Sequence, residues 1–110
     1  MKLKVVRANP AGNITLFVMD PVEREKRAGI AARLMAVPDW KAEQVAFLCA
    51  PQCGGDGRIE MMGGEFCGNA ARAYGMMVAR QRGDAAQVQI EISGVDHPVK
   101  VDVDLTMGTA

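Results

Sequence analysis

The stretch of the sequence best suited to chemistry is residues 64–75, GEFCGNAARAYG, in which a cysteine precedes a run of small apolar residues. Glycine and asparagine disfavour a helix interior and alanine favours it, so Cys67 is expected at or one residue before the start of a helix. Unpaired backbone N–H groups and the helix dipole favour negative charge at such a place. The stretch therefore predicts a cysteine whose thiolate form is stabilised, beside a site for an anion.

Cys67, Gly68 and Asn69 together suit the removal of a proton from the α-carbon of a bound carboxylate. A carboxylate held by the N–H groups of the helix start would place its α-carbon near the sulfur, where a thiolate can act as a general base. Gly68 lets a ligand approach the backbone, and Asn69 adds a neutral donor and acceptor. The alternative is an inert buried cysteine, which is the commoner role of a single cysteine. The polar, flexible helix start favours the catalytic interpretation.

Six strands and two helices are expected to position this stretch. β-Branched and alternating runs predict strands over residues 3–7, 14–19, 44–50, 58–62, 88–92 and 99–105. A first helix is predicted to begin with Asp20 as its N-cap, Pro21 in the first helical position and Glu23 in the third, and to end near Met35.

A second helix is predicted from the Cys67 motif to about residue 82, and its residues 70–79 are apolar nearly all round. Such a helix is buried on most sides. The simplest architecture is therefore α+β, with a mixed, mostly antiparallel β-sheet curled around this central helix and the first helix outside it.

Composition limits the other possibilities. With 110 residues the chain, residues 1–110, is expected to form a single domain, and its 49% apolar residues are enough for a core. Thirteen basic and thirteen acidic residues are interspersed, so no nucleic-acid partner is expected. We find no targeting signal and no apolar run of about 20 residues. A cytoplasmic protein without membrane contact is therefore expected.

The three cysteines do not form a disulfide framework, because their number is odd. The spacing of Cys49 and Cys53, with only His97 as a further ligand, is a poor zinc site. Cys49 is expected in a strand and packed in the core, and Cys53 in a glycine-rich turn. We therefore expect no bound metal.

The sequence FCGNAARAYG resembles the first catalytic cysteine motif of the diaminopimelate epimerase superfamily, which has Cys-Gly-Asn, then a small residue and soon an arginine. Two further stretches match in the same order. Residues 9–20, NPAGNITLFVMD, are similar to the family's N-terminal Gly-Asn-Asp-Phe turn and strand, and residues 42–45, AEQV, to its Gly-Ala-Asp-Gln-Val segment. The resemblance covers about residues 3–105.

This resemblance implies a racemase or epimerase that acts on an amino acid without pyridoxal phosphate or any other cofactor. Two cysteines face opposite sides of the substrate α-carbon; one removes a proton as thiolate and the other returns one as thiol. Cys67 corresponds to one of the pair. Gly68 and Asn69 are expected to hold the α-carboxylate, and Asn13 and Gln44 to line the substrate pocket.

The sequence departs from diaminopimelate epimerases before the cysteine, where residues 60–66 replace a longer segment whose asparagine contacts the distal part of the substrate. The resemblance thus allows another substrate, as in the family's histidine racemases. Glu65 is either a contact for a polar substrate side chain or a solvated loop carboxylate.

Members of the superfamily are built from two similar halves, and the second cysteine lies in the C-terminal half. We therefore expect this chain to be the N-terminal half of a two-lobed enzyme, to need the missing C-terminal lobe as its partner and to lack racemase activity alone. A second copy of the chain is another candidate partner.

Two alternatives remain open at this point. One is a related isomerase of the phenazine-biosynthesis or proline-racemase type, although those families usually show histidine where this sequence has Asn69. The other is a non-catalytic binding module or fragment in which Cys67 is a passive thiol.

Overall fold

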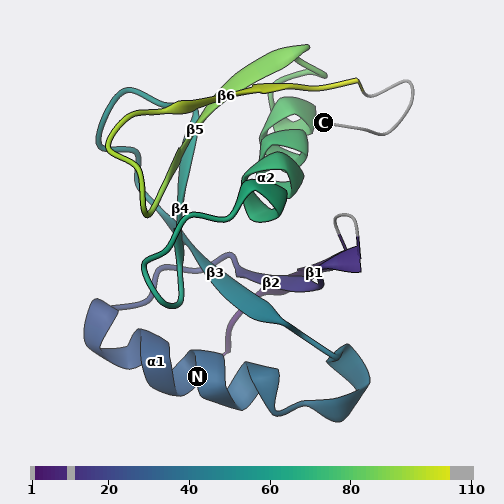
Figure 1. Ribbon diagram of the computed structural model, residues 1–110, viewed down its shortest axis with the longest axis vertical. Coiled ribbons are helices and arrows are strands. Elements are labelled where there is room, and N and C mark those ends of the chain that lie inside the picture. The colour runs from purple at the N-terminus through teal and green to yellow at the C-terminus, as the bar shows by residue number, and fades with distance from the viewer. Residues whose placement is uncertain (1, 10–11, 105–110) are drawn as a thin grey trace.

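The computed structural model describes residues 2–9 and 12–104, and its strands form one six-stranded sheet (Figure 1). The strands are β1 (Val5–Ala8), β2 (Thr15–Val18), β3 (Gln44–Cys49), β4 (Gly57–Met61), β5 (Gln87–Ile92) and β6 (Val99–Asp102). They lie side by side in chain order. Neighbouring pairs alternate between antiparallel and parallel, beginning with an antiparallel pair of β1 and β2. The sheet is mixed and is not closed into a barrel, and the predicted α+β class is confirmed.

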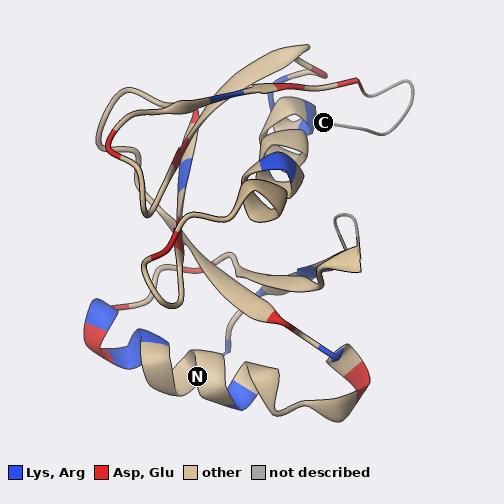
Figure 2. Ribbon diagram, viewed as in Figure 1, with Lys and Arg blue, Asp and Glu red and all other residues tan. Residues whose placement is uncertain are grey.

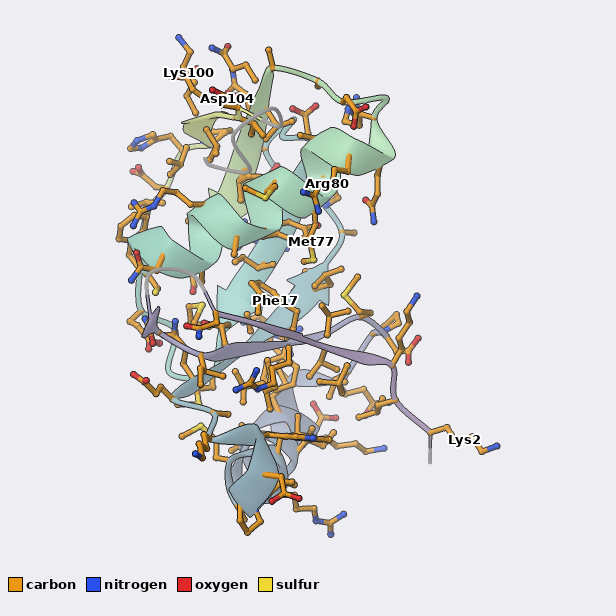
Figure 3. All side chains as sticks on the ribbon, turned by 90° about the vertical axis from the view of Figure 1, so that its right-hand side faces the viewer. Lys2, Phe17, Met77, Arg80, Lys100 and Asp104 are labelled. Atoms are coloured by element: carbon orange, nitrogen blue, oxygen red, sulfur yellow. The ribbon has the colours of Figure 1, made fainter. Side chains whose placement is uncertain are left out.

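Two helices, α1 (Arg24–Met35) and α2 (Gly68–Gln81), cover opposite faces of the sheet. The alternation of side chains along each strand decides which face a residue serves. In β2, Phe17 packs in the cluster around α2, whereas Leu16 and Val18 pack in the cluster under α1. Figure 3 shows Phe17 in the layer between its strand and α2. Both faces of β2 are consequently buried, as its uninterrupted apolar run predicts.

α2 is the central helix that its composition predicts. Side chains from all six strands pack into the cluster around it, and six of its own residues are buried. Small residues permit this close packing. A Cβ added at Gly75 would lie 2.8 Å from the side chain of Val101 on β6, so the helix and the strand approach too closely for a larger residue. The sheet therefore curls around α2, while α1 lies outside.

The predicted start of the first helix is wrong by about one turn. α1 begins at Arg24, after Glu23 as N-cap, and no side chain caps it. The carboxylate of Asp20 instead accepts a hydrogen bond from the backbone N–H of Lys4, at 2.6 Å. Since Met19 donates to the carbonyl of Lys4, Asp20 continues the pairing of the chain beside β1 and β2. The carboxylate of Asp20, which the local pattern assigns to a helix cap, is therefore engaged in a tertiary hydrogen bond.

The loop before α2 is held against the end of β5. Ser93 donates a hydrogen bond to the carbonyl of Glu65 at 2.6 Å, and its oxygen accepts one from the N–H of Met61 at 2.8 Å. Gly94 has a φ of +86°, and a Cβ there would lie only 2.4 Å from the backbone nitrogen of Phe66. Glycine at position 94 thus lets the segment that leads into Cys67 lie directly on the β5–β6 connection.

Charges of both signs are interspersed over the ribbon (Figure 2). α1 carries most of its charged side chains in its first turns, and α2 carries few. Within residues 2–9 and 12–104, no helix has the length and apolar character needed to cross a membrane.

Candidate functional site

Cys67 is the N-cap residue of α2, as the sequence predicts. Its backbone is extended, with φ −138° and ψ 110°, and its sulfur accepts a hydrogen bond from the backbone N–H of Ala70 at 3.4 Å. Its carbonyl accepts from the N–H of Ala71 at 3.0 Å, which begins the helical hydrogen bonding. The half-buried sulfur thus takes the place of the side-chain oxygen in an ordinary N-cap.

Two amides from distant parts of the chain also reach this sulfur. The Nε2 of Gln44 lies 3.0 Å from Sγ of Cys67, and the Nδ2 of Asn13 lies 3.9 Å from it. Gln44 begins β3, and Asn13 lies two residues before β2. Counting the N–H of Ala70, three N–H donors therefore converge on this sulfur.

Thr15 is a polar residue of this site that the sequence analysis missed. It is fully buried, and its side chain lies beside that of Gln44 because the two residues are partners in the parallel pairing of β2 and β3. The Nε2 of Gln44 donates to the hydroxyl of Thr15 at 2.8 Å. The hydroxyl in turn donates to the backbone carbonyl of Asn13 at 3.3 Å. A threonine at the start of an otherwise apolar strand is the only sequence signal for this role.

The structure brings together Cys67, Asn13 and Gln44, whereas Asn69 points elsewhere. The amide oxygen of Asn69 accepts a hydrogen bond from the guanidinium of Arg72, one turn further along α2. Gly68, the first residue of α2, lies under the same guanidinium, since a Cβ at this position would be 3.3 Å from Nη1 of Arg72. Binding of a substrate by these residues stays a prediction.

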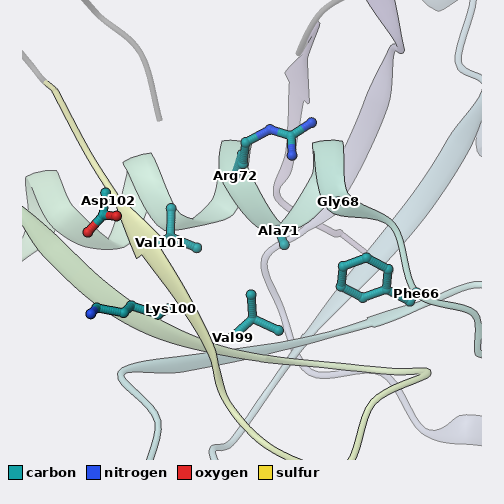
Figure 4. A pocket seen from close by; sticks show the side chains of 8 residues that line it. All are labelled: Phe66, Gly68, Ala71, Arg72, Val99, Lys100, Val101 and Asp102. Carbon is teal, nitrogen blue, oxygen red and sulfur yellow. The ribbon is translucent and has the colours of Figure 1, made fainter.

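A pocket of about 270 Å³ lies between the first turns of α2 and strand β6 (Figure 4). Its walls combine apolar side chains with two cations and a carboxylate. They are formed by Phe66, Gly68, Ala71, Arg72, Val99, Lys100, Val101 and Asp102. No sequence motif predicts this pocket, because residues 66–72 and 99–102 meet only through the packing of α2 on β6. Cys67 is not among the lining residues, and its sulfur instead faces the side chains of Asn13 and Gln44.

The remaining cysteines lie away from this site. Cys53 is exposed in the loop after β3, and Cys49 is half-buried at the end of β3, where its sulfur lies 3.5 Å from Nη2 of Arg27. Cys49 thus faces a polar cluster and not the apolar core that we expected. Burial, and then the negative charge of Glu60, raise the pKa of its thiol. Among the described residues, no group of three or more potential ligands is placed to hold a metal ion.

A buried ion-pair cluster lies on the sheet face that α1 partly covers. It consists of Arg27, Arg58, Glu60 and Glu91, whose side chains are between 2% and 18% exposed. Arg58 joins the two carboxylates, at 3.1 Å to Glu60 and 3.1 Å to Glu91. Glu91 also accepts three backbone N–H groups of the loop after β3, from Gln52, Cys53 and Gly55, at 2.7–2.8 Å. The cluster thus ties that loop and α1 to the middle of the sheet.

The charge of Glu91 makes a pH-dependent contribution to stability. Burial acts to raise its pKa, but the three backbone N–H groups and Arg58 outweigh burial and lower the pKa from the ordinary value of 4.5 to about 2. Because the pKa in the folded state is the lower one, Glu91 stabilises the fold above about pH 4.5, and this contribution is lost as the pH falls from there towards 2. Thermal unfolding between pH 7 and 2 should show a steeper loss over this interval for the parent chain than for Glu91→Gln. An equally steep loss in Glu91→Gln would contradict this assignment. The exposed Glu43→Gln serves as control and should unfold like the parent.

Comparison with known proteins identifies a family for this chain. A family model described as the histidine racemase CntK N-terminal domain matches residues 2–109. Two histidine racemases from strains of Fusobacterium nucleatum subsp. nucleatum are 33% and 31% identical to the chain over 105 residues, which is 92% of this chain and 37% and 38% of theirs. A histidine racemase from Staphylococcus aureus is 41% identical over 68 residues, or 60% of this chain and 25% of that protein.

The chain thus spans little more than a third of the length of the Fusobacterium relatives that it matches. The family model covers almost the whole chain, including the N-cap cysteine of α2 and the two residues whose side-chain amides donate to its sulfur, Asn13 and Gln44. On this evidence the chain belongs to the family of histidine racemase CntK N-terminal domains.

Proposed function

We propose that this chain is the N-terminal lobe of a cofactor-independent amino-acid racemase that acts on histidine, with Cys67 as one of its two acid–base groups. As thiolate, Cys67 takes the α-proton of one enantiomer and becomes a thiol, and the electron pair stays on the α-carbon and its carboxylate. A second thiol, from a C-terminal lobe, gives a proton to the opposite face. In the reverse direction the two sulfurs exchange roles.

The observation that carries this proposal is the surroundings of the Cys67 sulfur. Three N–H groups point at a half-buried sulfur at the start of a mostly buried helix. An inert core cysteine needs no such donors. Helix geometry leaves the first backbone N–H groups without intrahelical acceptors. Those of Gly68 and Asn69, which neither the sulfur nor the carbonyl of Cys67 takes, are the ones proposed to hold the substrate carboxylate as charge develops on it.

The exposed residues beside Cys67 support the need for a covering lobe. Phe66 is 46% exposed and Met62 is 37% exposed, and both lie in the short loop that leads into α2. A lobe closing over the substrate would bury these large apolar side chains, which lie on the loop that leads to the reacting cysteine. Exclusion of water by that lobe would strengthen the interactions with the developing charge.

Histidine is proposed as the substrate because the matching relatives are named histidine racemases. The chain's own departure from diaminopimelate epimerases in residues 60–66 agrees with a different side chain. Glu65 in this segment is exposed, and its carboxylate accepts a hydrogen bond from the N–H of Gly63 at 3.1 Å. This contact agrees with a solvated loop carboxylate.

Solvent-proton exchange tests the proposal. L-Histidine, L-lysine and diaminopimelate are incubated in D₂O with the chain alone and with the chain extended by a C-terminal lobe, and α-deuterium and the D-enantiomer are measured. The extended protein should exchange and racemise histidine in preference to the other two, and the chain alone should not turn over. Full turnover by the 110 residues alone would refute the half-site proposal, and no exchange of any amino acid by the extended protein would refute the activity.

A further inference from the structure

We infer that Thr15 is a positioning residue for the cysteine site, which turns the amide of Gln44 so that its nitrogen, and not its oxygen, faces the sulfur of Cys67. This inference rests on the proposed function, because it concerns the same sulfur. The hydroxyl of Thr15 has its hydrogen bonds with Gln44 and Asn13, and none joins it to that sulfur. It acts through Gln44, which contacts both residues.

The orientation of Gln44 follows from its hydrogen bonds. An amide nitrogen carries two hydrogens. One points to the hydroxyl oxygen of Thr15 at 2.8 Å and the other to Sγ of Cys67 at 3.0 Å. Turning the amide over would place its carbonyl oxygen against the sulfur, where it would repel the negatively charged form. Whichever group fixes the amide therefore decides whether the sulfur meets a donor or an acceptor.

Thr15 fixes the orientation of the Gln44 amide because the hydroxyl hydrogen of Thr15 is already engaged in another hydrogen bond. Its hydroxyl donates to the backbone carbonyl of Asn13 at 3.3 Å, so its oxygen is left to accept from the neighbouring amide. A carbonyl oxygen of Gln44 turned towards that hydroxyl would find no hydrogen. Thr15 is fully buried and Gln44 is 9% exposed, so water does not compete for these bonds.

The backbone holds this relay, the chain of hydrogen bonds from Thr15 through Gln44 to Cys67, in place. Thr15 and Gln44 are partners in the parallel pairing of β2 and β3. The N–H of Gln44 also lies 3.3 Å from the carbonyl of Ile14. Two residues further on, Phe17 and Ala46 pack in the cluster around α2, so this face of the sheet directs both polar side chains towards the start of that helix.

Site-resolved alkylation tests the relay without requiring racemase activity. The parent chain, Thr15→Val and Thr15→Ser are treated with iodoacetamide between pH 5 and 10, and the modification of each cysteine is followed by peptide mass spectrometry. Thr15→Val keeps the shape and the β-branching but removes the hydroxyl, whereas Thr15→Ser keeps the hydroxyl. At neutral pH, Thr15→Val should slow alkylation of Cys67 by about five-fold, the loss expected for one orienting hydrogen bond, and should move its pH profile to higher pH. Thr15→Ser should restore the parent profile.

Cys53 is the internal control in each sample, because it is exposed and lies in the loop after β3, where its backbone N–H donates to Glu91. An unchanged Cys67 profile in Thr15→Val, or a Thr15→Ser profile as altered as that of Thr15→Val, would overturn the relay. Circular dichroism checks that each variant is folded. Should Thr15→Val not fold, the Gln44 side-chain amide of the parent is read by ¹⁵N NMR. Slow exchange of both hydrogens and a shift on alkylation of Cys67 would support the relay, and rapid exchange would overturn it.

These outcomes are separate from those of the proposed function. A chain extended by a C-terminal lobe that racemises histidine while Thr15→Val leaves the Cys67 profile unchanged would retain the activity and refute the relay. An altered Cys67 profile in Thr15→Val, with no exchange of any amino acid by the extended protein, would retain the relay and refute the activity.

Discussion

Cys67→Ser, made in the chain extended by a C-terminal lobe, is expected to lower the rate of α-proton exchange of histidine by about 10³-fold or more. A serine hydroxyl fits the same N-cap position, so the helix start should be preserved. It does not ionise near neutral pH, however, and a positioned acid–base group typically contributes about 10²- to 10⁴-fold to a proton transfer. Deuterium incorporation into each enantiomer of histidine, measured by mass spectrometry, follows the loss.

Cys53→Ser is the matched control, since this exposed cysteine lies in the loop after β3 and does not contact the Cys67 sulfur. It should retain the parent rate. Retention of more than about a tenth of the rate by Cys67→Ser would be incompatible with the acid–base role, given the size of the usual contribution. Equal losses in both variants would point to unfolding, which circular dichroism detects.

Arg58→Met is expected to lower the free energy of unfolding by about 3 kcal/mol. The substitution removes the side chain that joins Glu60 to Glu91 and leaves two buried carboxylates without that cation. Removing one partner of a buried ion pair costs about 3–5 kcal/mol, and the lower end applies because Arg27 and the backbone N–H groups remain in place. Urea unfolding followed by circular dichroism, with linear extrapolation, measures the change.

Arg24→Met provides the control for this effect. Arg24 contacts the same carboxylate, at 3.2 Å to Glu60, but its side chain is 73% exposed. Exposed ion pairs contribute about 0–1 kcal/mol, so this variant should stay within about 1 kcal/mol of the parent. If Arg24→Met and Arg58→Met had equal effects, burial would not be the source of the stability.

Local sequence was sufficient wherever the determining interaction is local. The start of α2 at Cys67 follows from glycine and asparagine before a run of alanines, and the structure confirms it. The burial of α2 follows equally from its apolar circumference. The start of α1 was predicted wrongly by the same kind of argument. There the carboxylate of Asp20 pairs with the backbone of Lys4, and a tertiary contact overrides a local capping pattern.

The sequence did not predict the ion-pair cluster, for a related reason. Arg58 and Glu60 alternate with apolar residues in β4, which is also the pattern of a strand with one solvated face. Only the pairing of Arg58 with Glu91 across β4 and β5, together with the approach of Arg27 from α1, turns these side chains inwards. The pKa of Glu91 is accordingly a property of the assembled sheet.

For this protein the sequence alone determined the α+β class, the central helix and the position of Cys67 at its start, because hydrophobic periodicity and helix-end preferences act over a few neighbouring residues. The tertiary structure alone decided that the side chains of Asn13 and Gln44 donate to the sulfur of that cysteine, and that the hydroxyl of Thr15 accepts from Gln44. These residues are brought together by the parallel pairing of β2 with β3 and by the packing of α2 on one face of the sheet. Such contacts depend on strand register and on the burial of both faces, and no short stretch of sequence specifies either.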